Sequence, residues 1–268
     1  MALTQEQNAA KEALANEMAS YVHSVRIEDE NRMPFLVGSC VLLRVSQRLF
    51  ALTAAHVLDE NVNETLFIVT PNTSVILEGQ KHTTLSAYTD HRDDPIDVGV
   101  LQLDDPTSRE LQEAQTLTLG CCDALASPLP NALYFACGFP HTKNRRANLT
   151  TATVQANRFK FFSKSLPPDF YQDVNRNVGQ HFVVGFDKRH VIQDNRDVTA
   201  PHPHGVSGGA LWTTIGTAHR VLGILTDWFY PEHHVDAIGA IHIRLFLRAI
   251  SEKCPELQDE ISPVLANR

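Results

Sequence analysis

The 268-residue sequence lacks the features that mark several large classes of protein. It contains no run of about 18 apolar residues, so neither a transmembrane helix nor membrane association is expected. Its first residues have no basic region followed by an apolar core, so no secretory signal peptide is predicted. Lys and Arg number 23 against 31 Asp and Glu, and the net charge of −8 argues against a dedicated nucleic-acid-binding protein.

Cysteine is scarce, and its spacing fits no disulfide framework. The five cysteines include the adjacent pair Cys121 and Cys122, and no C-x-x-C spacing occurs. An odd number of unpatterned cysteines is typical of reduced thiols in an intracellular protein. We therefore expect a cytoplasmic location.

Histidine is plentiful, and two short segments are rich in it. His202 and His204 lie in "PHPH", and His233 and His234 lie in "EHHVD". A metal site is one interpretation of these segments. Their spacings do not reproduce a zinc signature and no cysteine pair accompanies them, so loop histidines near an active-site rim are favoured and no metal is expected.

The N-terminal segment follows helical spacing. Thr4 and Gln7 have the spacing of a capping box, and Leu14, Met18, Tyr21, Val22 and Val25 form an apolar stripe. The spacing predicts a helix over residues 4–25, within a segment 1–30 that packs on the body of the protein. A helix that binds a partner protein is the alternative.

Beyond this helix, short apolar segments bounded by turn residues follow one another. "PFLVGSCVLLRV" and "RLFALTAAHVL" flank Ser46 and Gln47, which predicts a hairpin. About a dozen such segments with few helical stretches between them favour an all-β barrel or sandwich over a parallel α/β sheet. A last amphipathic helix is predicted over residues 243–251, and Pro255 limits its extent.

The segment "HGVSGGALW" places Ser207 between glycines and ahead of an apolar strand. A serine hydroxyl needs a base within hydrogen-bond reach, and a third group that orients the base, before it acts as a nucleophile. The segment also fits a glycine-rich turn. It matches the G-x-S-x-G elbow of α/β-hydrolases as well, but that elbow requires a helix after the serine, and a strand is predicted here.

Two other residues have settings that suit the base and the orienting acid. His56 closes "FALTAAHVL", where an apolar strand gives way to small residues, and Asp97 stands where the strand of "DDPIDVGVLQL" begins. Taken singly, each also fits a structural role, as a satisfied histidine or a strand-start aspartate. Together, the order His56, Asp97, Ser207 is that of the chymotrypsin-type triad.

The segments "LTAAHV", "IDVGVLQL" and "GVSGGALW" resemble the three signature blocks of trypsin-like (chymotrypsin-fold) serine peptidases. "GILTDW" is similar to the substrate-pairing strand of that family, and "AIGAIHIRLFL" to the closing strand and helix of its bacterial members. The resemblance covers about residues 35–250 and points to a bacterial intracellular type. It implies two six-stranded antiparallel β-barrels with an N-terminal and a C-terminal helix. Residues 31–115 would carry His56 and Asp97, and residues 116–268 would carry Ser207 and the last helix and tail.

The resemblance also implies a mechanism. Ser207 would attack a peptide carbonyl, His56 would act as general base and then acid, and Asp97 would orient His56. The backbone N–H groups of Gly205 and Ser207 would form an oxyanion hole. The partner would be a protein or peptide substrate, and no metal or organic cofactor is required. A catalytically silent binding or scaffold module with the same fold is the alternative.

Val206 is a departure from the family pattern. Digestive members carry at that position an aspartate that pairs with a newly cut N-terminus, and no "IVGG"-like start precedes the first strand here. Activation by cleavage is therefore not expected. The enzyme would be active as made, or switched by a regulatory partner or by rearrangement of the 186–206 loop.

The substrate pocket is inferred only from the resemblance. Its predicted residues are Pro201, His202, Thr226, Asp227, Trp228 and Gly239. Pro201 stands about where trypsin-like specificity needs an acid, so a strict preference for Arg or Lys is not expected. Asp227 or Asp236 could still supply a charge, and Trp228 would narrow the cleft if it lines it.

Overall fold

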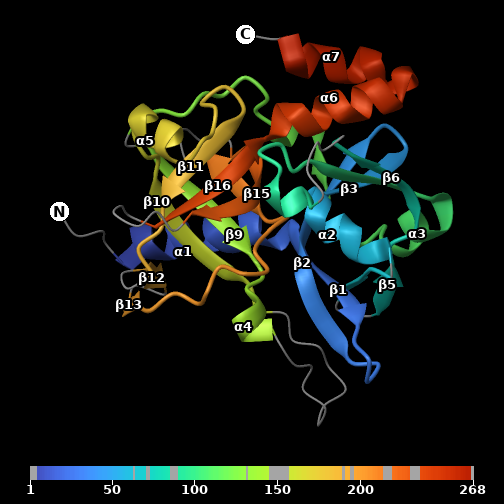
Figure 1. Cartoon of the computed structure of the whole chain (residues 1–268), viewed down its shortest axis with the longest axis horizontal. Helices are drawn as coiled ribbons and strands as arrows, with labels where there is room; N and C mark the ends of the chain where they lie inside the picture. The colour runs from blue at the N-terminus through green and yellow to red at the C-terminus, as the bar shows by residue number, and fades with distance from the viewer. Residues whose placement is uncertain are drawn as a thin grey trace.

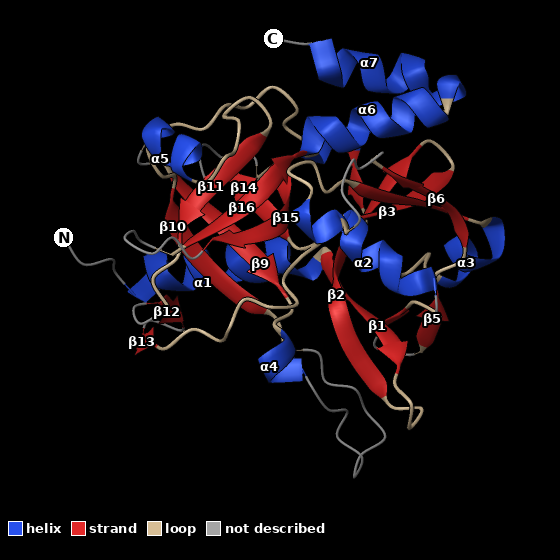
Figure 2. Ribbon diagram, in the orientation of Figure 1, coloured by secondary structure: helices blue, strands red, loops and turns tan. Residues whose placement is uncertain are grey.

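Two curled antiparallel β-sheets, lying side by side, make up most of the structure (Figures 1 and 2). The computed structural model describes residues 5–62, 64–70, 73–84, 90–130, 132–144, 157–188, 191–193, 196–213, 219–229 and 236–266. Each sheet curls into a half-barrel, as in a chymotrypsin-like double barrel with terminal helices. The predicted fold class is therefore confirmed.

The first sheet is built from the N-terminal part of the chain. Among the described residues its strand order is β5 (Ser74–Ile76), β4 (Phe67–Val69), β1 (Val22–Glu28), β2 (Pro34–Val45), β3 (Arg48–Thr53), β7 (Gly99–Leu103) and β6 (Gly79–Thr83), and β8 (Leu117–Thr118) pairs parallel with β2. The predicted hairpin is present, because β2 and β3 pair antiparallel and Ser46 takes a turn conformation with φ of 53°.

The second sheet is built from the C-terminal part. Its order is β10 (Phe159–Lys164), β9 (Leu133–Gly138), β14 (Ala210–Thr213), β15 (Val221–Phe229), β16 (Ala237–His242) and β11 (His181–Gly185), while β12 (Val191–Gln193) and β13 (Arg196–Val198) form a separate hairpin. This sheet has the six predicted strands. The first has eight rather than six, and its extra strands are short, since β4 and β5 have three residues each and β8 has two.

Helices lie at the edges of the two sheets (Figure 2). The helices are α1 (Gln5–Ser20), α2 (Ala55–Asp59), α3 (Asp105–Glu110), α4 (His141–Asn144), α5 (Pro168–Asp173), α6 (Ile243–Lys253) and α7 (Gln258–Ala266), with 3-10 turns η1 (Glu60–Val62), η2 (His91–Asp93), η3 (Leu119–Cys121) and η4 (Pro255–Leu257). The predicted last helix corresponds to α6, whereas α7 was not predicted. None of the described helices combines the length and apolar character that a membrane crossing requires.

The N-terminal helix is shorter than predicted. It ends at Ser20, and Val22 and Val25, which the helical stripe included, lie in β1. Both valines fit a helical spacing, but β-branched side chains also suit a strand. Pairing with β2, from Val22 opposite Val41 onward, decides in favour of the strand. Helix α1 contributes Met18 to the main core.

Each half-barrel has its own core, and a third core joins them. Because side chains alternate along a strand, β2 serves two cores. Val41 and Leu43 belong to the core shared by both sheets and the terminal helices, and Cys40 and Leu42 to the core of the first half-barrel. This burial on both faces explains why β2 reads as a continuous apolar run. The two halves also meet at the loop that contains Ser207, because the Ser207 carbonyl oxygen accepts the Ser39 N–H of β2 at 2.7 Å.

Candidate active site

Pairing of β3 with β7 brings His56 and Asp97 together. Thr53 at the end of β3 lies opposite Gly99 at the start of β7. His56 follows β3 in the short helix α2, and Asp97 stands two residues before β7. The pairing of these two strands therefore brings residues 41 positions apart in the sequence next to each other, and Asp97 lies directly beside the start of α2.

The carboxylate of Asp97 holds the His56 ring in one orientation. Asp97 Oδ2 lies 2.5 Å from His56 Nδ1, and Asp97 Oδ1 accepts the His56 backbone N–H at 3.0 Å. The Asp97 side chain is 4% exposed and that of His56 is 15% exposed. A carboxylate at Nδ1 assigns the proton of the neutral ring to that nitrogen, which leaves Nε2 as the acceptor. This is the tautomer that a general base requires.

Ser207 lies in the same groove as His56. The groove has a volume of about 470 Å³ and runs between the two half-barrels, and both side chains line it. The Ser207 hydroxyl donates to the carbonyl oxygen of Thr226 at 3.3 Å. Among the described contacts, no hydrogen bond joins Ser207 to His56. Such bonds are often long before substrate binds, and a rotation of χ1 changes the partner of a serine hydroxyl.

Two glycines give the loop before and after Ser207 its path. Gly205 has φ of +93° and Gly208 has φ of +85°, a region that other residues rarely adopt. A Cβ atom on Gly208 would lie 1.7 Å from the backbone oxygen of Ser39. The loop therefore lies directly against β2, with no room for a side chain at this position.

The backbone of this loop presents two N–H groups without acceptors. The carbonyl of His204 accepts from the His141 N–H at 2.7 Å, and the carbonyl of Val206 accepts from the Gly209 N–H at 2.8 Å. In a trans peptide the N–H of the next residue points opposite to the carbonyl. The N–H groups of Gly205 and Ser207 therefore point away from these anchors, and neither has an acceptor in the described part of the chain. Paired N–H groups beside a nucleophile can stabilise an oxyanion.

Val206 is held by apolar packing. Its side chain is 5% exposed and belongs to the core of the second half-barrel. A Cβ atom on Gly138 would lie 2.9 Å from Val206 Cβ, so the valine sits directly on the backbone of β9. Van der Waals contact thus occupies the position at which digestive family members place an ion pair.

The predicted substrate-binding residues divide into two groups. Thr226, Asp227 and Trp228 line the groove, whereas Pro201, His202 and Gly239 are not among its lining residues. The groove also contains residues that sequence reasoning did not predict as substrate-binding. They are Ile27, Phe35, Leu36 and Val37 from β1 and β2, with Glu60 and Arg92. His204, which the sequence placed near an active-site rim, lines the groove beside Gly205. The apolar character of the four residues from β1 and β2 does not by itself indicate a binding wall.

Asp227 is paired inside the protein. Arg176 donates to it through Nη2 at 2.8 Å and Nε at 3.3 Å, and the Thr226 hydroxyl donates to it at 3.0 Å. Both charged side chains are 11% exposed. Arg176 lies in a loop 51 residues earlier, and no sequence pattern pointed to it.

A charged cluster holds the end of α2. Asp59 accepts from Lys81 Nζ at 2.9 Å, and its other oxygen lies 2.6 Å from His91 Nδ1. His91 Nε2 lies 3.1 Å from the carbonyl oxygen of Thr84, so both ring nitrogens face acceptors. Burial acts against the charged ring, but these acceptors outweigh it and raise the pKa of His91. The cluster ties the helix that carries His56 to the segment that leads to Asp97.

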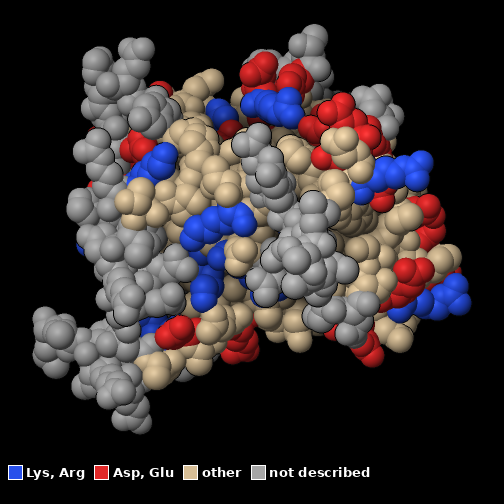
Figure 3. Space-filling model, turned by 90° about the horizontal axis from the view of Figure 1, so that it is seen from below, with Lys and Arg blue, Asp and Glu red and all other residues tan. Residues whose placement is uncertain are grey.

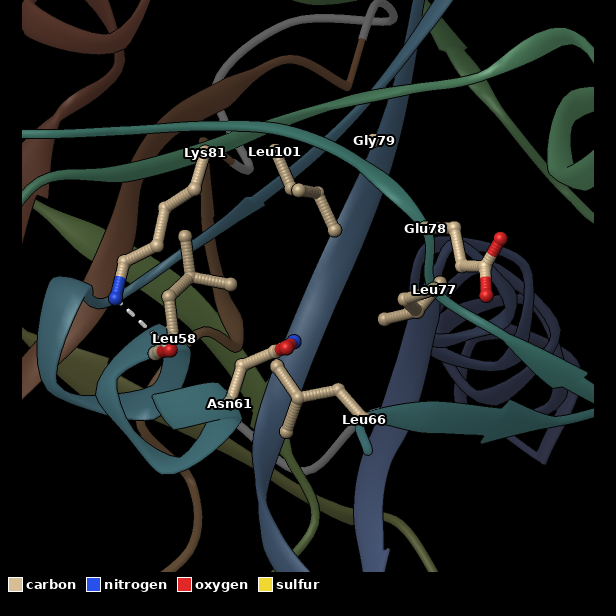
Figure 4. A pocket seen from close by; sticks show the side chains of 8 residues that line it. All are labelled: Leu58, Asn61, Leu66, Leu77, Glu78, Gly79, Lys81 and Leu101. Atoms are coloured by element: carbon tan, nitrogen blue, oxygen red, sulfur yellow. Dashed lines mark hydrogen bonds between the residues drawn. The ribbon is translucent and has the colours of Figure 1, made fainter. Parts of the chain in front are cut away.

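A second cavity, of about 310 Å³, lies in the first half-barrel and contains none of the predicted site residues (Figure 4). Leu58, Leu66, Leu77 and Leu101 point into it, and the Glu78 carboxylate points away. Lys81 Nζ bonds to the Leu58 carbonyl oxygen at 3.0 Å. The cavity is lined mainly by leucine side chains, with the Asn61 amide and Lys81 beside them.

The histidines of the described residues form no metal site, and one face of the molecule shows a mixed distribution of charge. Among the described residues no group of three His, Cys, Asp or Glu side chains could hold a metal ion, and His233 and His234 lie outside those residues. All five cysteines are free thiols. Seen from below, Lys and Arg side chains gather near the middle of the face and acidic side chains lie mostly towards its edges (Figure 3).

Comparison with known proteins identifies the family of the chain. A family model described as a trypsin-like peptidase domain matches residues 38–224. This span contains His56, Asp97 and Ser207, together with the loop that surrounds the serine. A search of curated proteins finds no match.

Proposed function

The chain belongs to the trypsin-like peptidase family, and from this premise we propose that it is a serine endopeptidase that cleaves peptide bonds through an acyl-enzyme. One observation carries the proposal. A histidine oriented by a buried carboxylate shares a groove with a serine whose loop presents two N–H groups that have no acceptor among the described residues. These are the base, nucleophile and oxyanion donors that acyl transfer requires.

The first half of the reaction forms the acyl-enzyme. Ser207 Oγ turns from the Thr226 carbonyl to His56, gives its proton to Nε2 and attacks the substrate carbonyl carbon. The negative oxygen of the tetrahedral intermediate lies against the N–H groups of Gly205 and Ser207. The cationic ring of His56 is stabilised by Asp97. His56 then returns the proton to the leaving nitrogen, the C–N bond breaks, and the amine product departs.

The second half releases the acid product. Water takes the place of the amine and loses a proton to His56 as it attacks the ester carbon. Collapse of the second intermediate breaks the bond to Oγ, and His56 returns the proton to the serine. No cofactor enters either step. The free thiols of all five cysteines support a cytoplasmic location, so we propose that the substrates are proteins or peptides of that compartment.

A fluorophosphonate probe tests this function. It should label the wild-type chain at Ser207, and Ser207→Ala and His56→Ala should abolish labelling. Ser74→Ala is the matched control, because Ser74 is exposed on β5 and should leave labelling unchanged. Undiminished labelling of Ser207→Ala would show that another residue is the nucleophile.

One observation favours a second candidate, a catalytically silent binding module. The Ser207 hydroxyl bonds to Thr226 and not to His56 among the described contacts. In a silent module this arrangement would persist when a peptide binds. A folded wild-type chain that binds peptides by calorimetry, but is neither labelled nor able to cleave them, would support the module and contradict the enzyme.

A further inference from the structure

An aromatic contact closes the gap between the loop that precedes Ser207 and strand β15. His202 lies on the loop that leads to Ser207, and Trp228 lies two residues beyond Thr226 in β15. Their ring centroids are 4.4 Å apart at an interplanar angle of 79°, an edge-to-face contact. Such contacts are attractive and hold rings in place. The loop and the strand on either side of the gap are therefore joined by their own side chains.

The space behind this contact is also filled. Gly239 faces β15 from β16, and a Cβ atom there would meet Phe229 Cε2 at 2.9 Å and Asp227 Cβ at 3.1 Å. Ile238, opposite Trp228, is 1% exposed. The lining of the groove includes Trp228 but neither His202 nor Gly239. Within the described residues, the groove thus stops at the Trp228 ring.

The carboxylate on this wall is already paired. Arg176 and the Thr226 hydroxyl use both oxygens of Asp227, and the Arg176 guanidinium lies 5.1 Å from the centre of the Phe229 ring. A cationic substrate side chain would have to displace this largely buried arginine, whose side chain is 11% exposed, to reach Asp227. The cost of leaving a buried charge unpaired opposes that exchange.

The catalytic geometry places one substrate residue at this gap. The Thr226 carbonyl accepts the Ser207 hydroxyl, so residues 226–228 of β15 lie next to the reacting serine and line the groove there together with Gly205. A substrate residue whose carbonyl carbon reaches Ser207 Oγ therefore lies beside Trp228, and His202 packs against that ring. A large side chain there would have to break the aromatic contact.

We propose that this chain cleaves after residues with small uncharged side chains, namely Gly, Ala or Ser, and that His202 and Trp228 determine this specificity. The inference rests on the proposed peptidase function. The two rings limit the size of the side chain, and the Arg176–Asp227 pair removes the attraction for Lys or Arg.

Peptide substrates that differ only in the residue before the scissile bond test the inference. For the wild-type chain, kcat/KM should be at least about 10-fold higher with Ala or Ser than with Phe or Arg, in line with the discrimination that a misfitting side chain causes. Trp228→Ala and His202→Ala should each raise the ratio of kcat/KM for Phe to that for Ala by about 10-fold or more. His219 does not line the groove, so His219→Ala should leave the ratio of kcat/KM for Phe to that for Ala unchanged. Trp228→Val serves as a second, milder variant if the alanine variant does not fold.

The outcomes separate the two proposals. A wild-type chain that prefers Phe or Arg to Ala overturns the specificity, as does an unchanged ratio in folded Trp228 and His202 variants. A small alkyl fluorophosphonate reacts with the serine without a peptide side chain. A chain that it labels, but that cleaves no substrate after Gly, Ala or Ser, contradicts this inference alone. A folded chain that it does not label contradicts the proposed function.

Discussion

Lowering the pH from 7.5 to 5 should destabilise the fold through two buried histidines, His23 and His242. His23 is 8% exposed, and its Nε2 lies 2.9 Å from the carbonyl oxygen of Gln115. His242 is 1% exposed, and its Nδ1 accepts the Arg244 N–H at the start of α6 at 3.2 Å. Burial lowers the pKa of each ring from 6.5 to about 4. Both rings are therefore neutral in the folded chain at pH 5.

The magnitude follows from the difference between the two states. An unfolded histidine takes up a proton as pH falls through about 6.5, whereas these two do so only near pH 4 when folded. The unfolded state binds more protons in this window, so stability falls as pH falls. From pH 7.5 to 5 each histidine lowers the free energy of unfolding by about 2 kcal/mol. Together the loss is about 4 kcal/mol, a large part of the total stability of a typical domain, about 5–15 kcal/mol.

Urea unfolding, followed by tryptophan fluorescence at pH 7.5 and 5, measures this loss. His23→Gln keeps a donor towards Gln115, and His242→Asn keeps an acceptor at the helix start. Each variant should remove about 2 kcal/mol of the pH-dependent loss, whatever it does to stability at pH 7.5. His204→Asn is the control, because this histidine is exposed, and it should leave the loss unchanged.

Two results would refute this reasoning. One is a wild-type free energy of unfolding that does not fall between pH 7.5 and 5. The other is a full pH-dependent loss in the double variant, which would show that other groups take up the protons.

Three further predictions concern the site. Asp97→Asn should lower kcat by about 10⁴-fold because it favours the wrong histidine tautomer. Asp94→Asn keeps a side-chain oxygen that accepts the Ile96 N–H, so it should change kcat only a few-fold. A larger loss of kcat in Asp94→Asn than in Asp97→Asn would mean that Asp94 is the orienting acid. Gly208→Ala places a methyl group 1.7 Å from a backbone oxygen at φ of +85°, so urea unfolding should show a loss of about 3 kcal/mol or more. Gly120→Ala, whose methyl group would lie 3.8 Å from Thr118 Oγ1 at an ordinary contact distance, should show almost none. The pKa of His91 is raised in the folded chain, so this ring stabilises the fold fully below about pH 6.5 and loses that effect as pH rises through the folded pKa. His91→Asn should therefore lower the free energy of unfolding more at pH 6 than at pH 9. An equal decrease at both pH values would argue against a charged ring.

The order of His56, Asp97 and Ser207, with their settings at strand ends or in a glycine loop, carried the family resemblance. Those settings depend on nearby residues. The apolar character of the strand segments and the conformation of Gly205 and Gly208 are local properties, so a sequence expresses them directly. Even so, local pattern left Val22 and Val25 between helix and strand, and pairing with a distant segment decided.

What the sequence by itself predicted was an all-β class, because strand periodicity and backbone sterics act over a few residues. The double barrel and the roles of His56, Asp97 and Ser207 were implied by the resemblance to the peptidase family. Only the tertiary structure decided which side chains surround them. Arg176 reaches Asp227 across 51 positions, and His202 meets Trp228 from another loop. Such contacts depend on how separate loops pack in three dimensions, and no spacing along the chain encodes that distance.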